Sequence, residues 1–140
     1  MIYAVFDTNV LVSALLSKSA DSTISLLIKH FIEGEITPLY SDDILEEYTE
    51  VLSRAKFHFL PEVCKALVNR IKSQGINSER TPFEGFMPDE SDRVFYEIAL
   101  NKEDAYLVTG NLKHFPETPI VVTPAEMLEI LVRKNGQLTK

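Results

Sequence analysis

Acidic side chains from three separated segments could share one site in this chain. Asp7 directly follows an apolar run at residues 2–6, Glu47 stands in a helix-like segment, and Asp92 stands near the start of another. Clustered carboxylates repel one another unless they bind a proton or a cation. Ligand sets made only of oxygen favour Mg²⁺ or Mn²⁺, and such an ion can activate water for attack on a phosphodiester. A divalent cation site is therefore one interpretation of these acids.

Each acid also has a simpler interpretation. Asp7 or Thr8 can cap the helix that begins there. Asp89 and Asp92, three residues apart at a helix start, are typical of an N-cap and a capping-box-like partner. Glu47 alone is typical of a solvated helix residue, so the pattern by itself leaves both interpretations open.

Other chemically versatile side chains carry weaker signals. Asn111 follows a Thr-Gly pair, and asparagine there is typical of a turn. The single cysteine, Cys64, lies in the apolar row of a helical segment, which indicates a core residue. No histidine has a partner at metal-ligand spacing, so we expect no catalytic role for His30, His58 or His114.

The elements that must position these side chains can be predicted from the apolar pattern. Short apolar runs predict strands at 2–6, 37–40, 105–109 and 120–122. Helical periodicity and start signals predict helices at 8–16, 20–33, 42–54, 61–73, 90–101 and 124–133. Residues 76–88 contain turn-forming residues and predict a loop with at most a short strand. Strands that are nearly all apolar and alternate with helices indicate a parallel sheet covered on both faces.

Such a sheet would bring several polar side chains to one edge. Parallel α/β sheets bind ligands at the carboxyl ends of their strands, near the point where the strand order reverses. Asp7 follows the first strand, and Thr109, Gly110 and Asn111 follow the strand that ends in "YLV". On the helix at 42–54, Glu47 projects about 100° from the centre of the apolar face and so lies on its flank.

Composition and charge limit the class of protein. The chain has 140 residues, of which 45% are hydrophobic and 25% charged, and we expect a single domain over residues 1–140 with an ordered core at about 1–133. No apolar stretch approaches the roughly 20 residues of a membrane-spanning helix, and the N-terminus lacks the basic region of a secretory signal. A single cysteine fits a reducing compartment, so we expect a cytoplasmic protein. The net charge of −7 argues against a protein that coats nucleic acid, but it is compatible with an enzyme that meets phosphates through a bound cation.

Four segments, in this order, resemble PIN-domain proteins: "VFDTNVLVSALL", "SDDILEEYTEVLSRAKF", "PDESDRVFYEIALNKEDAYLVTGN" and "VVTPAEML". The most similar group is the VapC-like toxin components of prokaryotic toxin–antitoxin systems, and the resemblance covers nearly the whole chain. It implies a three-layer α/β/α sandwich with a doubly wound parallel sheet of four to five strands. It also implies an Mg²⁺- or Mn²⁺-dependent endoribonuclease that leaves a 5′-phosphate and a 3′-hydroxyl.

The family motif carries over residue by residue. Its three acids fall on Asp7, Glu47 and Asp92, which the resemblance makes the metal ligands and the catalytic residues. Its supporting positions fall on Asn9, Asp89, Thr109 and Asn111. The last of these departs from the family pattern, because a neutral amide stands where the family has a carboxylate. The resemblance therefore implies a site with one negative charge fewer.

Substrate and partners are implied in the same way. RNA and a cognate antitoxin are the implied partners, a homodimer is expected, and no membrane is involved. The candidate RNA contacts are Arg54, Lys56, Arg93 and Lys113.

Two alternative functions remain at this stage. A PIN-like fold with weak or absent catalysis could bind RNA or a protein partner, and Asn111 favours that alternative. A phosphatase that forms an aspartyl-phosphate on Asp7 would need a second aspartate two residues later as general acid. The chain has Asn9 there, which makes the phosphatase a minor alternative.

Overall fold

A computed structural model describes residues 1–138, so the last two residues of the domain expected over 1–140 lie outside the described residues. Five parallel strands form one sheet in the order β3-β2-β1-β4-β5. The strands are β1 (Ile2–Phe6), β2 (Ile36–Tyr40), β3 (Ile76–Asn77), β4 (Tyr106–Val108) and β5 (Val121–Val122). The predicted parallel α/β sheet is confirmed.

Helices connect and cover these strands. The α-helices are α1 (Thr8–Leu16), α2 (Thr23–Ile32), α3 (Asp42–Leu52), α4 (Pro61–Gln74), α5 (Arg93–Leu100) and α6 (Pro124–Leu138). Three short 3₁₀ turns, η1 (Ala55–Phe57), η2 (Glu90–Asp92) and η3 (Leu112–His114), lie in the connections.

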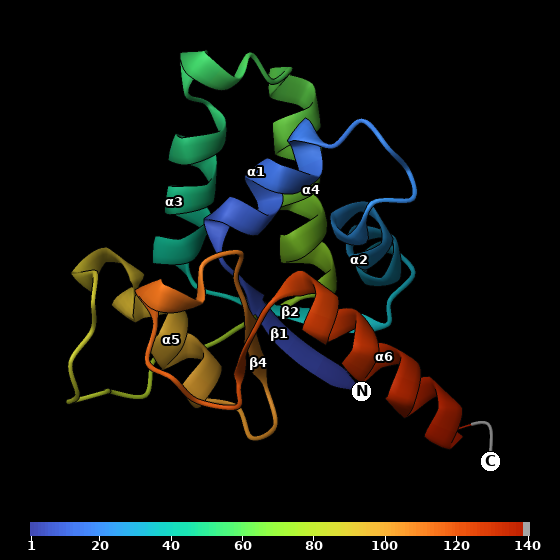
Figure 1. The fold of residues 1–140 in the computed structure, drawn as a ribbon. Coiled ribbons are helices and arrows are strands. Elements are labelled where there is room, and N and C mark those ends of the chain that lie inside the picture. Colours follow the sequence, from blue (N-terminus) through green and yellow to red (C-terminus); the bar gives the residue numbers. More distant parts are fainter. Residues whose placement is uncertain (139–140) are drawn as a thin grey trace.

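The strand order places helices on both faces of the sheet. The chain moves from β1 through β2 to β3 in one direction and then crosses back to β4, on the other side of β1. Because crossovers between parallel strands are right-handed, this reversal puts α5 on the opposite face from the earlier crossover helices. Figure 1 shows α5 on one side of the strands and α2 with α6 on the other. The three-layer sandwich is thus confirmed, with its switch point between β1 and β4.

The core fills the space between these layers. Every residue of β1 except Tyr3 is buried, as is every residue of β2 except Thr37. The largest fully buried side chains include Phe6, Phe31, Tyr48 and Phe95, which come from a strand and three helices. The rings of Phe6 and Phe31 meet edge to face at 5.7 Å between centroids.

Several element boundaries differ from the predictions, most of them by one to three residues. The helix expected at 90–101 begins as the 3₁₀ turn η2, and its α-helical part starts only at Arg93. Strand β4 starts at Tyr106 because the N–H of Ala105 still donates to Lys102 O, in a turn where Asp104 has a φ of 62°. Helix α6 continues beyond residue 133 to Leu138.

Within residues 1–138, no helix is both long enough and apolar enough to cross a membrane.

Candidate metal centre

The carboxyl ends of β1 and β4 meet at the switch point and carry the first site residues. Phe6 pairs with Val108 in the sheet, so Asp7 and Thr109 follow at the same level. The N–H of Asp7 donates to Val108 O at 2.9 Å, and the buried Thr109 hydroxyl donates to Asp7 Oδ2 at 2.8 Å. Asp7 occupies the N-cap position of α1, but its side chain makes no capping hydrogen bond to that helix. Thr109 therefore orients the Asp7 carboxylate.

Asn9 fastens the loop after β4 to helix α1. Its Oδ1 accepts a hydrogen bond from the Gly110 N–H at 3.1 Å. The next N–H, that of Asn111, donates to Thr109 Oγ1 at 3.0 Å. Asn9 thus holds the "TGN" loop against the helix, and Thr109 connects that loop to Asp7.

Helix α3 brings Glu47 to the same edge. Ser41 caps the helix by accepting from the Ile44 N–H, and Ile44, Tyr48 and Leu52 form its buried stripe. The Tyr48 hydroxyl donates to Phe6 O, which attaches α3 to the end of β1. Glu47 lies on the flank of the buried stripe, half-buried, and its Oε2 accepts a hydrogen bond from the Thr8 hydroxyl.

Asp92 is buried at the last position of η2, directly before α5. Its Oδ2 atom is buried and has no hydrogen-bond partner, whereas polar atoms inside proteins are normally satisfied. His114 Nδ1 lies 3.5 Å from this oxygen, beyond ordinary hydrogen-bond distance. Asp89 is different, because it is exposed and its Oδ1 accepts hydrogen bonds from the N–H and hydroxyl of Ser91. Asp89 therefore caps η2.

Burial raises the pKa values of all three acids of the site. Burial, followed by the charges of Asp7 and Asp89, raises the pKa of Asp92 to about 6, and His114 offsets only part of this. Burial also raises the pKa of Asp7, and the hydrogen bond from Thr109, which lowers that pKa, offsets only part of the rise. Burial raises the pKa of Glu47 as well, and the charge of Asp7 adds to that rise. The charge of Asp7 thus raises the pKa of both Glu47 and Asp92.

His114 also lies beside this group, although it has no partner at metal-ligand spacing in the sequence. The ring lies between Asp92 and Asn111, with Nε2 at 2.9 Å from the Asn111 side-chain amide. Asn111 and His114 are three residues apart across η3, and such residues lie on the same side of a 3₁₀ turn. That spacing was visible in the sequence, but it has meaning only once the segment is known to be a 3₁₀ turn.

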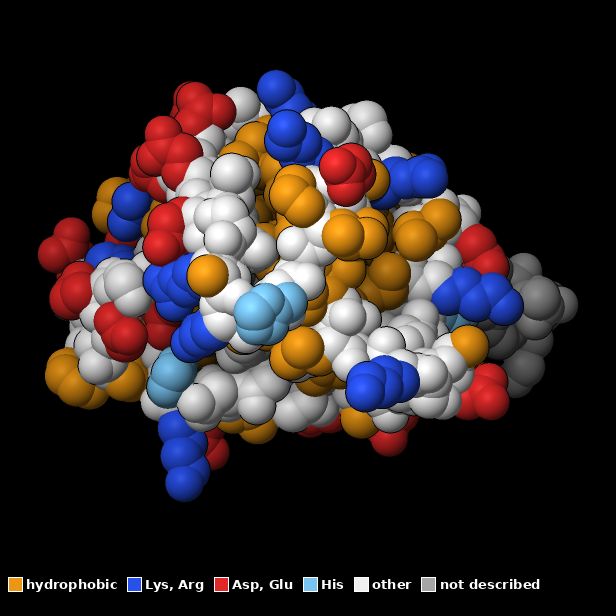
Figure 2. All heavy atoms as spheres, turned by 90° about the horizontal axis from the view of Figure 1, so that it is seen from above, with side chains coloured by type: hydrophobic (Ala, Val, Ile, Leu, Met, Phe, Trp, Pro, Cys, Tyr) orange, Lys and Arg blue, Asp and Glu red, His pale blue; other side chains and the backbone are white. Residues whose placement is uncertain are grey.

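The basic residues suggested as RNA contacts are not equally available. The Arg93 guanidinium donates to Glu90 and to the carbonyls of Phe83 and Gly85, so it holds the loop before η2. Arg54 pairs with Glu50 through two hydrogen bonds. The two lysines among the candidates, Lys56 and Lys113, are exposed. Figure 2, seen from the end at which α3 passes into α4, shows Lys and Arg side chains spread among apolar ones, with acidic side chains crowded at the left.

The side chains of the described residues do not form a complete set of metal ligands by themselves. Within residues 1–138, no three His, Cys, Asp or Glu side chains are grouped so that they could hold one. Divalent cations that keep several waters, as Mg²⁺ does, need only one or two carboxylates plus substrate phosphate oxygens. The unpartnered Asp92 oxygen and the acids around it fit such a partial ligand set.

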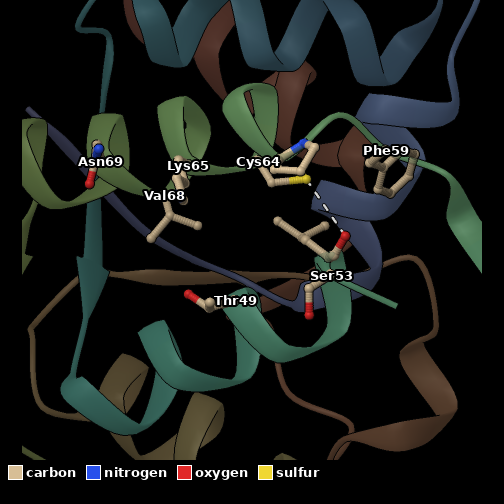
Figure 3. A pocket seen from close by; sticks show the side chains of 9 residues that line it. Thr49, Ser53, Phe59, Cys64, Lys65, Val68 and Asn69 are labelled. Carbon is tan, nitrogen blue, oxygen red and sulfur yellow. Dashed lines mark hydrogen bonds between the residues drawn. The ribbon is translucent and has the colours of Figure 1, made fainter. Parts of the chain in front are cut away.

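A separate apolar cavity of about 270 Å³ lies between α3 and α4, away from these acids. Figure 3 shows Cys64 at its wall, with Sγ 3.6 Å from the Leu52 carbonyl to which it donates. Cys64 is half-buried against the core, and burial raises the pKa of its thiol. A protonated thiol in an apolar wall is typical of packing, as the sequence predicts.

A doubly wound α/β/α fold with acids at its switch point defines the class of protein. The family model described as PIN domain matches residues 3–113, and the chain belongs to the PIN-domain family. The predicted resemblance is thus confirmed. PIN domains are generally nucleases and usually use divalent metals, so the chain belongs to a class of hydrolases that act on phosphodiester bonds. No curated protein and no solved structure matched the chain.

Proposed function

We propose that this protein is a divalent cation-dependent endoribonuclease and the toxin of a toxin–antitoxin pair. The observation that supports it most is the buried Asp92 oxygen without a hydrogen-bond partner, in a group of acids at the β1/β4 switch point. An uncompensated buried carboxylate is costly, and a bound cation would remove that cost.

Asp7, Glu47 and Asp92 would hold the cation, directly or through water. When bound, the cation activates water for attack on the phosphodiester and neutralises charge that develops on the phosphate. Thr109 and Thr8 orient the Asp7 and Glu47 carboxylates by donating hydrogen bonds to them. Such outer partners fix ligand geometry and the protonation state of each ligand.

The substrate would meet the site through exposed basic side chains. Lys113 on η3 directly precedes His114, and Lys56 lies beyond the end of α3. Because the chain has a net charge of −7, RNA binding would depend on these few cations and on the bound metal rather than on a broad basic surface. The expected products carry a 5′-phosphate and a 3′-hydroxyl.

A cognate antitoxin and homodimerisation are part of this proposal. Several large apolar side chains are exposed on α2 and near the start of α4, and they would suit a protein partner. They are Leu26, Ile32, Leu60 and Val63.

The test is cleavage of a labelled single-stranded RNA by purified protein in Mg²⁺, in Mn²⁺ and in EDTA. We expect internal cleavage with either ion and none in EDTA, and slower cleavage of a DNA of the same sequence. Absence of cleavage with intact RNA binding would favour the catalytically inactive RNA-binding module. Cleavage that persists in EDTA would contradict the metal-dependent function.

A further inference from the structure

The imidazole of His114 bridges two side chains of the site. Its Nδ1 lies 3.5 Å from Asp92 Oδ2, and its Nε2 lies 2.9 Å from Asn111 Nδ2, the nitrogen of the side-chain amide. Asp92 Oδ2 is buried and has no hydrogen-bond partner. A ring nitrogen and a carboxylate oxygen therefore face each other at ion-pair distance but form no hydrogen bond.

The separation suits two ligands of one cation better than a direct bond. At 3.5 Å a nitrogen–oxygen hydrogen bond is not formed. Ligand atoms that each lie about 2.0–2.2 Å from one ion and are 3.5 Å apart subtend an angle of about 105–120° at that ion. Such an angle is close to the tetrahedral one and wider than the angle between neighbouring ligands of a regular octahedron.

Asn111 can support this arrangement by its amide chemistry. The oxygen and nitrogen of an asparagine amide exchange places when the group rotates by a half-turn, and their assignment rests on the hydrogen-bond network. With Oδ1 toward the ring, Asn111 accepts the Nε2–H of a neutral His114, and the lone pair of Nδ1 points to Asp92. Metal-binding histidines are held in this way, by donating their other N–H to an oxygen acceptor.

We propose that His114 Nδ1 and Asp92 Oδ2 together bind the divalent cation, with Asn111 orienting the imidazole. His114 thereby supplies a ligand from η3, where the amide of Asn111 is directed at the ring. Imidazole nitrogen is a ligand for transition ions, whereas Mg²⁺ prefers oxygen, so a His114 ligand raises the affinity for transition ions, Mn²⁺ included, relative to Mg²⁺. This inference rests on the cation site of the proposed function.

The experiment uses the full chain loaded with Mn²⁺, and its variants are matched at two histidines. Pulsed electron paramagnetic resonance detects nitrogen bound directly to Mn²⁺, and calorimetry measures the affinity for Mn²⁺ and for Mg²⁺. The variants are His114→Ala, His114→Asn and the control His58→Asn. His58 is exposed and has a φ of 55°, a backbone conformation that asparagine tolerates.

We expect a bound-nitrogen signal in the wild type and in His58→Asn, and its loss in His114→Ala. His114→Ala weakens Mn²⁺ binding by about tenfold, within the range seen when the shell around a metal is altered. His114→Asn replaces Nδ1 with an amide that can offer oxygen, so it retains Mg²⁺ binding and lowers the affinity for Mn²⁺ relative to Mg²⁺. Stoichiometric Mn²⁺ binding without a nitrogen signal would overturn the proposal.

Cleavage of RNA by the same samples separates this proposal from the nuclease function. Metal-dependent cleavage without bound nitrogen contradicts His114 as a ligand and leaves the nuclease intact. Bound nitrogen without cleavage supports His114 as a ligand and contradicts the nuclease. Absence of any Mn²⁺ binding contradicts His114 as a ligand, and it contradicts the nuclease as well if the protein cleaves no RNA in Mg²⁺.

Discussion

Asp92 and Glu97 are two buried acids on one segment, five residues apart, and their surroundings differ. They are 9% and 6% exposed, respectively. Glu97 accepts hydrogen bonds from the Arg80 guanidinium at 2.7 Å and from the Phe83 N–H at 2.8 Å. Asp92 has one buried oxygen without any hydrogen bond. The two acids are therefore buried to a similar degree, but only the Glu97 carboxylate has its hydrogen bonds satisfied.

The pKa values of the two acids shift in opposite directions. Burial would raise the pKa of Glu97, but the Phe83 N–H and the Arg80 guanidinium together outweigh it and lower that pKa. Burial and neighbouring acids raise the pKa of Asp92 to about 6. Glu97 fastens the loop at 80–83 to α5, whereas Asp92 is left available to a cation. A functional site is thus indicated by the missing partner rather than by burial.

The largest expected effect is on catalysis, from a change in the group of acids around Asp92. Asp7→Asn keeps an oxygen that can accept the Thr109 hydroxyl but removes a ligand charge. We expect the rate of RNA cleavage in Mg²⁺ to fall by about 10³-fold or more, because the metal supplies most of the charge stabilisation. Cleavage of labelled RNA checks it. Wild-type rates in Asp7→Asn would remove the acid cluster from the mechanism.

Glu97→Gln is expected to act on stability instead. The change removes the charge that pairs with Arg80 and weakens the bond to the Phe83 N–H. We expect the free energy of unfolding at pH 7 to fall by about 2 kcal/mol, less than for a fully buried pair because Arg80 is partly exposed. Urea denaturation measures it. The metal-dependent rate per folded molecule should stay within about threefold, since Glu97 lies outside the site.

Asn111→Asp adds a negative charge beside His114. A carboxylate at this position still accepts the Nε2–H of His114 and increases the negative potential at Asp92. We expect the affinity for divalent cations to rise by about tenfold, as for other changes in the shell around a metal. Calorimetry with Mn²⁺ and Mg²⁺ measures it, with Asn69→Asp on α4 as a surface control. Equal affinities in Asn111→Asp and the wild type would show that position 111 does not influence the cation.

Asp92→Asn should stabilise the metal-free protein in a pH-dependent way. The pKa of Asp92 is about 6 in the native protein against an ordinary value of 3.8. Ionised Asp92 therefore destabilises the folded state, a cost that is absent below about pH 4, grows as the pH rises to 6, and is complete above it. After allowance for solvent screening, the variant should gain on the order of 1 kcal/mol at pH 8 and nothing at pH 3.5. Urea denaturation in EDTA at both pH values measures it, and a gain at pH 3.5 alone would contradict this sign.

Much of the fold could be predicted because the signals are local. The apolar run before Asp7 and the stripe on α3 that leaves Glu47 at its flank are sequence patterns, and the structure contains both elements. The PIN-domain resemblance was also carried by contiguous motifs.

The surroundings of the site could not be predicted in this way. His114 reaches Asp92 only through the 3₁₀ turn η3, and no spacing rule connects residues 22 positions apart in different elements. Glu97 is buried although it is charged, because Arg80 arrives from the irregular segment after β3. Tertiary contacts determine these partners, and therefore which buried acid has all its oxygens hydrogen-bonded.

The most direct test of the central claim is calorimetric titration of Mn²⁺ into three proteins at pH 7.5, at a temperature where all are folded. The proteins are the wild type, Asp92→Asn and Glu97→Gln. The unsatisfied acid should bind the cation and the satisfied acid should not, so the wild type and Glu97→Gln should give similar Kd values. Asp92→Asn should bind at least about tenfold more weakly. Equal Mn²⁺ affinity in Asp92→Asn and the wild type would contradict the account.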